Sequence, residues 1–114
     1  MVMDTLTTRA ETGISPAAMG ARAEEVAALL KTLAHPARLM LVCMLVEGEH
    51  SVGELEERLD LHQPHLSQQL TVLRGAGVVA TRREGKQIFY SLAEAKAGRL
   101  IGALHSIFCA EAMQ

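Results

Sequence analysis

Residues 51–92 read SVGELEERLDLHQPHLSQQLTVLRGAGVVATRREGKQIFYSL, and the order of the patterns in this stretch decides the fold. In its first half apolar residues recur at helical spacing, which predicts two short helices joined by a turn. The first of these helices opens with an S-x-x-E capping box. In the second half VVATRR and KQIFYSL alternate, which predicts two strands joined at Glu84-Gly85.

The second helix, predicted from about residue 64 to 74, has two chemically different faces. Leu66, Leu70 and Leu73 share one face at helical spacing. The opposite face is small and amide-rich, and such side chains form hydrogen bonds with base edges in the major groove of DNA. The alternative is an ordinary solvated helix. We expect base contacts from Gln63, His65, Ser67 and Gln68, and from Gln69, whose neighbours face the core.

The hairpin after this helix has a cationic tip. A helix that reads bases beside a hairpin that binds phosphate is the plan of a winged helix-turn-helix. From residue 63 to 90 there are four cations and one anion, a net charge of +3, whereas from 47 to 60 there are six anions and one cation, a net charge of −5. We expect phosphate contacts from Arg82, Arg83 and Lys86, and also from Arg74 and Tyr90.

The length of 114 residues predicts one domain, over residues 15–111, after a flexible tail at 1–14. A net charge of −2 argues against a nonspecific nucleic-acid coat but permits a local basic site. There is no apolar run of the length that a membrane span needs, and the start of the chain does not resemble an export signal. We therefore expect a cytoplasmic protein without a membrane partner.

The flanking segments predict a homodimer. An alanine-rich helix opens at Ser15-Pro16, and an almost wholly apolar helix follows His35-Pro36 and ends at Gly48. A last helix, from about Leu92 to Glu111 behind a second capping box at Ser91 and Glu94, has a broad apolar stripe. The fold class that we predict is mainly α with a small β-hairpin, a winged helix-turn-helix that dimerises through its first and last helices.

The segment LLKTLAHPARLMLVCMLVEGE, followed by residues 51–92, resembles the ArsR family of bacterial winged-helix repressors over roughly residues 25–110. The resemblance implies a dimer on double-stranded operator DNA that an inducer releases. The C-x-C pair of arsenic and cadmium sensors would fall near residues 51–53, where there is no cysteine. The zinc pattern on the last helix is broken after His105, so neither common metal site is expected.

The two cysteines, Cys43 and Cys109, are placed as in the reactive-sulfur-responsive branch of that family. This resemblance implies that persulfide, polysulfide or a related oxidant joins them, through a disulfide or a bridge with added sulfur, and so weakens DNA binding. His105 lies one turn before Cys109 and is either a hydrogen-bond donor to the thiolate or a structural histidine.

Three alternatives stay open from the residues alone. The same fold could sense a metal or metalloid through Cys43 and Cys109, although two thiols are few ligands for a stable site. It could be a dimeric adaptor that does not bind DNA, which the cationic tip disfavours. An enzyme is not expected, because there is no Gly-rich phosphate loop and no paired carboxylates in a plausible cleft, and no cofactor is implied.

Overall fold

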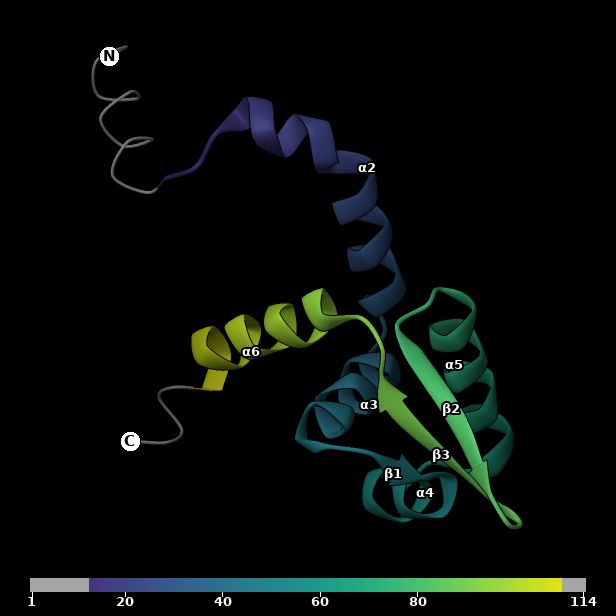
Figure 1. Ribbon diagram of the computed structural model, residues 1–114. Helices are drawn as coiled ribbons and strands as arrows, with labels where there is room; N and C mark the ends of the chain where they lie inside the picture. The colour runs from purple at the N-terminus through teal and green to yellow at the C-terminus, as the bar shows by residue number, and fades with distance from the viewer. Residues whose placement is uncertain (1–12, 110–114) are drawn as a thin grey trace. The chain divides into compact units, whose positions relative to one another are not determined.

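The computed structural model describes residues 13–109 (Figure 1). The chain divides into two compact units, residues 1–31 and 32–114. Helix α2, Pro16–Leu33, makes up most of the described part of the first unit, and it starts as predicted, since the amide of Ala18 donates to Ser15 Oγ at 3.2 Å. The predicted tail falls almost entirely outside the described residues, as does the predicted end of the last helix near Glu111.

The second unit is a winged helix-turn-helix, as predicted. Its antiparallel sheet has the strand order β1-β3-β2, and β2 and β3 form the expected hairpin. Strand β1 was not predicted, because two residues are too few to produce an alternating pattern. No helix within residues 13–109 is by itself long and apolar enough to cross a membrane. The elements are α3 (Pro36–Glu47), β1 (His50–Ser51), α4 (Val52–Leu59), α5 (Gln63–Gly75), β2 (Val79–Glu84), β3 (Gln87–Leu92) and α6 (Ala95–Cys109).

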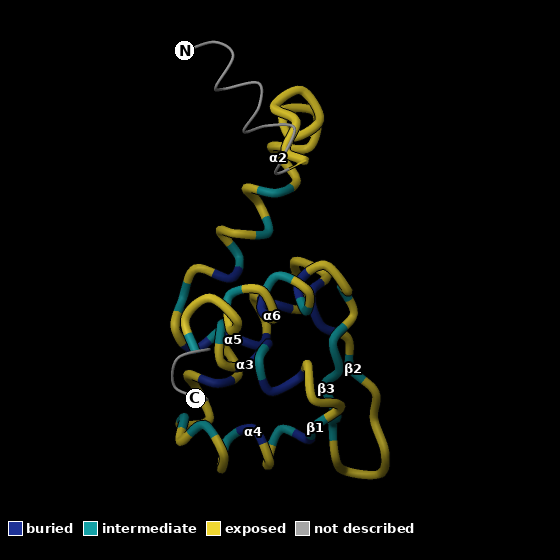
Figure 2. Tube along the Cα trace, turned by 90° about the vertical axis from the view of Figure 1, so that its left-hand side faces the viewer, coloured by how far each residue is buried: buried dark blue, intermediate teal, exposed yellow. Residues whose placement is uncertain are grey.

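Helix α3 is the centre of this unit. It packs against α4, α5, α6 and β3, which explains why its sequence is apolar on nearly every side. Leu41 and Val42 have no exposed surface, and Figure 2 shows buried segments along α3 while the tip of the hairpin is exposed. The facing helices contribute Leu55, Leu66, Leu70 and Leu73 to the same core. The expected position of α3 is therefore confirmed.

Helix α4 is fixed at its start by the predicted capping box. Ser51 Oγ accepts from the amide of Glu54 at 3.2 Å, and Glu54 Oε1 accepts from the amide of Ser51 at 2.8 Å. The second predicted box is wrong. Strand β3 continues through Ser91 to Leu92, so α6 starts later, and Glu94 accepts from the amide of Lys96 at 2.9 Å.

Glycine is required in the wing and in the turn before it. Gly77, which follows α5, has φ 78°, and Gly85 at the tip of the hairpin has φ 63°. Both values lie in the left-handed region, where a side chain adds strain. Within the sheet, Tyr90 of β3 is the register partner of His50 on one side and of Thr81 on the other.

We predict that Leu41→Ala lowers the free energy of unfolding by about 2–5 kcal/mol, because the substitution leaves a cavity among packed helices. Met40→Ala is the matched control, since the neighbouring Met40 is half exposed and should lose much less. Urea unfolding at one fixed protein concentration measures both. Equal losses for the two variants would contradict the central position of α3.

The capping box predicts a pH dependence of stability. The amide of Ser51 donates to Glu54 and lowers the pKa of that carboxyl. A lowered pKa means that the stabilisation is complete above the ordinary pKa of glutamate and is lost as the pH falls through the lowered value. Glu54→Gln should therefore lose less stability than the wild type between about pH 6 and pH 3. Glu57→Gln, on the same helix, should keep the wild-type acid dependence in urea unfolding; an unchanged acid dependence of Glu54→Gln would contradict this account.

Candidate nucleic-acid interface

The outer face of α5 presents the polar side chains that the sequence singles out. Pro64 lies in the first turn of the helix, and Leu66, Leu70 and Leu73 anchor the inner face. This anchoring leaves Gln63, His65, Ser67 and Gln68 exposed on the other side, as expected. The face is uncharged, and its amide and hydroxyl groups can donate to and accept from base edges.

Gln69 differs from the expectation that it contacts a base. Only 5% of its surface is exposed, because its spacing from Leu66 and Leu73 turns it towards the core. Its Oε1 accepts from Arg38 Nη1 at 2.8 Å, and Arg38 Nε donates to the carbonyl of Thr32 at 2.5 Å. Arg38 was not singled out from the sequence, although a cation within an apolar helix is a signal for such a contact. Gln69 therefore helps to hold α5 against α3 and has almost no surface for DNA.

Helix α5 and the wing meet at an open hollow of about 280 Å³. Gln63 lines it from the start of α5, and Lys86 and Gln87 line it from the hairpin. Ser51 and Gly53 close it from the side of α4. The fold therefore brings together an expected base-contacting residue and an expected phosphate-contacting residue that are 23 positions apart in the chain.

The cations of the wing fall into two classes. Arg83 and Lys86 are exposed, and no ion pair within residues 13–109 involves either of them. Arg82 is held by Glu49, with Nε and Nη2 each 2.8 Å from a carboxylate oxygen, and by Glu84 at 2.8 Å from Nη1. These hydrogen bonds, with Glu49 the stronger influence, raise the pKa of Arg82 further above its usual range. Glu49 could not be identified as a partner of Arg82 from local pattern, because the contact depends on strand register.

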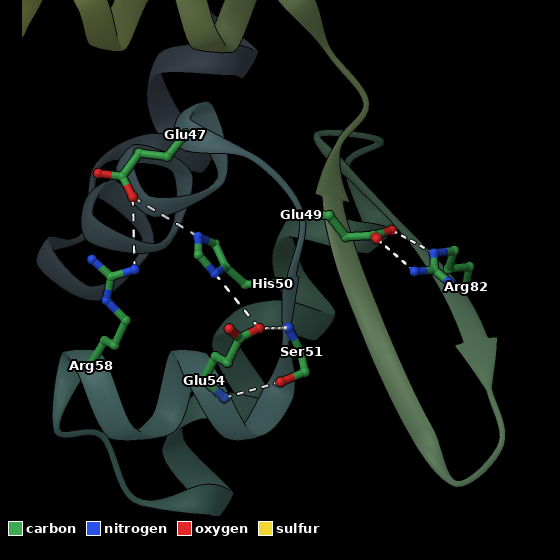
Figure 3. Close-up of polar contacts among 7 residues, drawn as sticks. All are labelled: Glu47, Glu49, His50, Ser51, Glu54, Arg58 and Arg82. Carbon is green, nitrogen blue, oxygen red and sulfur yellow. Dashed lines mark hydrogen bonds and ion pairs between the residues drawn. The ribbon is translucent and has the colours of Figure 1, made fainter.

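A polar cluster lies where α3, β1 and α4 meet (Figure 3). His50 Nε2 is 4.0 Å from Glu47 Oε1, and His50 Nδ1 is 3.8 Å from Glu54 Oε1. Both ring nitrogens are buried, and neither has a hydrogen-bond partner among the described residues. Arg58 lies 3.8 Å from Glu47 on the other side of the cluster. In the described part of the chain no group of three or more histidine, cysteine or carboxylate side chains is arranged to hold a metal ion.

The two thiols lie on helices that pack against each other. Cys43 is in the middle of α3 and Cys109 is the last residue of α6, and both are half-buried, free thiols. The helices approach closely at Gly98 of α6, where a Cβ atom would lie 3.7 Å from Val46 Cγ2 and 2.8 Å from Leu92 Cδ2. A side chain at Gly98 would therefore collide with Leu92 at the end of β3, whereas the distance to Val46 of α3 is that of an ordinary contact.

Comparisons with known proteins agree with the fold. Residues 35–81 match the family described as bacterial regulatory protein, arsR family. The chain is 73% identical over 93 residues to the Biofilm growth-associated repressor of Agrobacterium fabrum, covering 82% of this chain and 80% of that protein. It is 46% identical over 81 residues to the Transcriptional activator HlyU of Vibrio cholerae, covering 71% and 75%.

A solved structure extends the likeness to three dimensions. The crystal structure of the transcriptional repressor BigR from Xylella fastidiosa superimposes with a TM-score of 0.82 at 64% identity, covering 84% of this chain and 98% of that one. These relatives are transcriptional regulators, which agrees with the expectation that the chain is not an enzyme. The exposed helix face, the wing and these likenesses together place the chain in the arsR family of bacterial regulatory proteins.

Proposed function

We propose that this chain is a DNA-binding transcriptional repressor that binds operator DNA as a homodimer and is released when its two thiols are joined. The observation that carries the DNA-binding part is the shared hollow between Gln63 of α5 and Lys86 of the wing. A duplex laid against this surface meets uncharged hydrogen-bonding groups at the major groove and cations at the flanking phosphates.

Repression is favoured over activation by the names of the relatives. The relatives of A. fabrum and X. fastidiosa, at 73% and 66% identity, are named repressors, whereas the relative named an activator is at 46%. A repressor acts by occupying its site, so tight binding in the absence of inducer is the property to measure.

The homodimer is supported by the far half of α6. Ile107 is 69% exposed and Phe108 is 76% exposed, next to each other at the end of an amphipathic helix. Large exposed apolar side chains of this kind mark protein interfaces. A second copy related by a two-fold axis would cover both patches at once and present two α5 helices to a palindromic site.

The switch is supported by the positions of the thiols relative to the packing contact. Cys43 lies one turn before Val46 in α3, and Cys109 lies three turns after Gly98 in α6, about 16 Å along the helix axis. Val46 of α3 lies near the start of α6 at Gly98, whereas Ile107 and Phe108 near the end of α6 are exposed. A covalent link between the thiols fixes the far half of α6 against α3, and that half contains Ile107 and Phe108 of the proposed dimer surface. Bridging would therefore change the orientation of one subunit relative to the other and so the distance between the two α5 helices.

A sensor of metal or metalloid ions that uses the same thiols is the second candidate. It is less favoured, because within residues 13–109 no third histidine, cysteine or carboxylate completes a ligand set with the cysteines. Cadmium chloride is a suitable probe for it, since soft ions prefer thiolate ligands.

DNA binding is tested with a duplex that is enriched from a random pool on the wild-type protein and then measured by gel shift. Arg83→Gln should weaken binding and make the slope of log affinity against log salt shallower by about 2 per dimer, because each lost phosphate contact contributes about 0.9. Gln68→Ala should cost about 1–3 kcal/mol per half-site at unchanged slope and relax the enriched sequence.

Arg99→Gln on α6 is the control for charge alone, since Arg99 is exposed and belongs neither to α5 nor to the wing. It should retain the wild-type slope. Failure of the wild type to enrich any duplex would refute DNA binding, and a wild-type slope for Arg83→Gln would remove the wing from the interface.

The switch is tested on the same duplex before and after treatment with sodium tetrasulfide, hydrogen peroxide or cadmium chloride. Cys43→Ser and Cys109→Ser should each bind as the wild type does when untreated, and should each retain binding after the reagent that releases the wild type. Intact-protein mass spectrometry distinguishes the products, because a disulfide loses two hydrogens whereas a longer bridge gains sulfur atoms. Release of the Cys43→Ser dimer by the same reagent would exclude an intramolecular bridge.

A further inference from the structure

Arg82 differs from the other cations of the wing in that carboxylates surround it. Both oxygens of Glu49 accept from its Nε and Nη2 at 2.8 Å, and Glu84 accepts from Nη1 at 2.8 Å. The guanidinium also lies over the ring of Phe89, 4.5 Å from its centroid. Every nitrogen of this side chain is thus engaged inside the molecule, in the forked geometry that makes arginine–carboxylate pairs directional.

The contact spans the whole sheet. Glu49 lies in the turn between α3 and β1, at one edge, and Arg82 lies on β2, at the other edge, with β3 between them. Phe89 of β3 is the register partner of Ser51 on β1 and of Arg82 on β2, so the side chains meet above its ring. Adjacent strands lie about 4.8 Å apart, so the pair connects β2 with the turn that leads into β1, two strand spacings or roughly 10 Å away. Figure 3 shows the carboxylate of Glu49 and the guanidinium of Arg82 facing each other.

The charge of this group does not suit a phosphate contact. One guanidinium and two carboxylates sum to +1 − 2 = −1. The hydrogen bond from Arg82 lowers the pKa of Glu49, because it favours the ionised carboxylate. Three of the five N–H groups of Arg82 already donate to carboxylates, including the Nε and Nη2 pair that would grip a phosphate with two hydrogen bonds, and a phosphate would approach a net negative group. Arg83 and Lys86, by contrast, are exposed next to it.

We propose that Glu49 and Arg82 form a clamp that fastens the wing to the turn after α3, and that Arg82 positions the wing instead of binding phosphate. The inference rests on the proposed DNA-binding function. It adds a second path by which a change at the thiols is transmitted to the wing. Cys43 lies six residues before Glu49 on the same helix and its exit turn. A shift at the end of α3 therefore reaches the wing through this pair as well as through the core.

The experiment compares Glu49→Gln, Arg82→Gln, their double variant, Arg82→Lys and Arg83→Gln on the duplex enriched with the wild type, over a series of salt concentrations. Glu49→Gln and Arg82→Gln should each weaken binding by about two- to fivefold, although they change the charge in opposite directions. The double variant should lose no more than either single variant, because both remove one contact. None of the three should change the salt slope, whereas Arg83→Gln should make it shallower by about 2 per dimer.

Arg82→Lys separates positioning from phosphate binding. Lysine keeps the charge but cannot form the fork, so it should fail to restore affinity if Arg82 is a clamp. Glu57→Gln on α4 controls for the removal of a negative charge, because Glu57 has no ion pair within residues 13–109. Restoration by lysine, a shallower slope for Arg82→Gln, or tighter binding by Glu49→Gln than by Glu57→Gln would overturn the proposal.

Amide hydrogen exchange in the absence of DNA gives a second readout. Glu49→Gln and Arg82→Gln should accelerate exchange across residues 82–89 to the same extent, and Glu57→Gln should not. If the wild type bound no duplex, DNA binding would be refuted, and the exchange rates would still decide whether the clamp holds the wing. Unchanged exchange rates in both variants would show that the Glu49–Arg82 pair does not hold the wing in place.

Discussion

The packing of α3 against four other elements is the constraint on which the rest of the second unit depends. A helix that is in contact with α4, α5, α6 and β3 has almost no freedom to rotate or slide without disturbing each of them. Helix α5 takes its position from this packing, and the orientation of its exposed face follows. The half-buried Cys43 belongs to the same helix, so a chemical change there acts on the element that contacts α4, α5, α6 and β3.

Hydrophobic packing alone does not determine how the elements are oriented relative to one another. Three polar contacts add this directional constraint. Arg38 holds α5 through Gln69, the box of Ser51 and Glu54 fixes the start of α4, and Arg82 joins the wing to Glu49. The first and the third of these contacts join residues that lie 31 and 33 positions apart in the chain. A winged helix needs such contacts, because the helix that faces the bases and the hairpin beside it must keep a defined spacing to fit one groove and its flanking phosphates.

Much of this architecture was predictable from local pattern. Four features could each be predicted from a few adjacent residues, and the structure confirms them. They are the apolar α3, the leucine spacing of α5, the capping box at Ser51 and the hairpin at Glu84-Gly85. What could not be predicted depends on residues distant in sequence. The pairing of Glu49 with Arg82 requires strand β1, which two residues form without any pattern of their own. The same limit applies to Gln69: it has the same chemistry as Gln68, and only the partner on α3 makes it a structural residue. The start of α6 was placed too early because the strand before it continues through a residue type that also caps helices.

The aromatic content of the chain has a practical consequence for spectroscopy. There is no tryptophan and there is one tyrosine, Tyr90, on the central strand between His50 and Thr81. Intrinsic emission excited in the near ultraviolet therefore originates from a single phenol ring in the sheet. The intensity and lifetime of the Tyr90 emission therefore report the environment of β3 between β1 and β2. Each subunit has one such fluorophore, and no attached dye is needed.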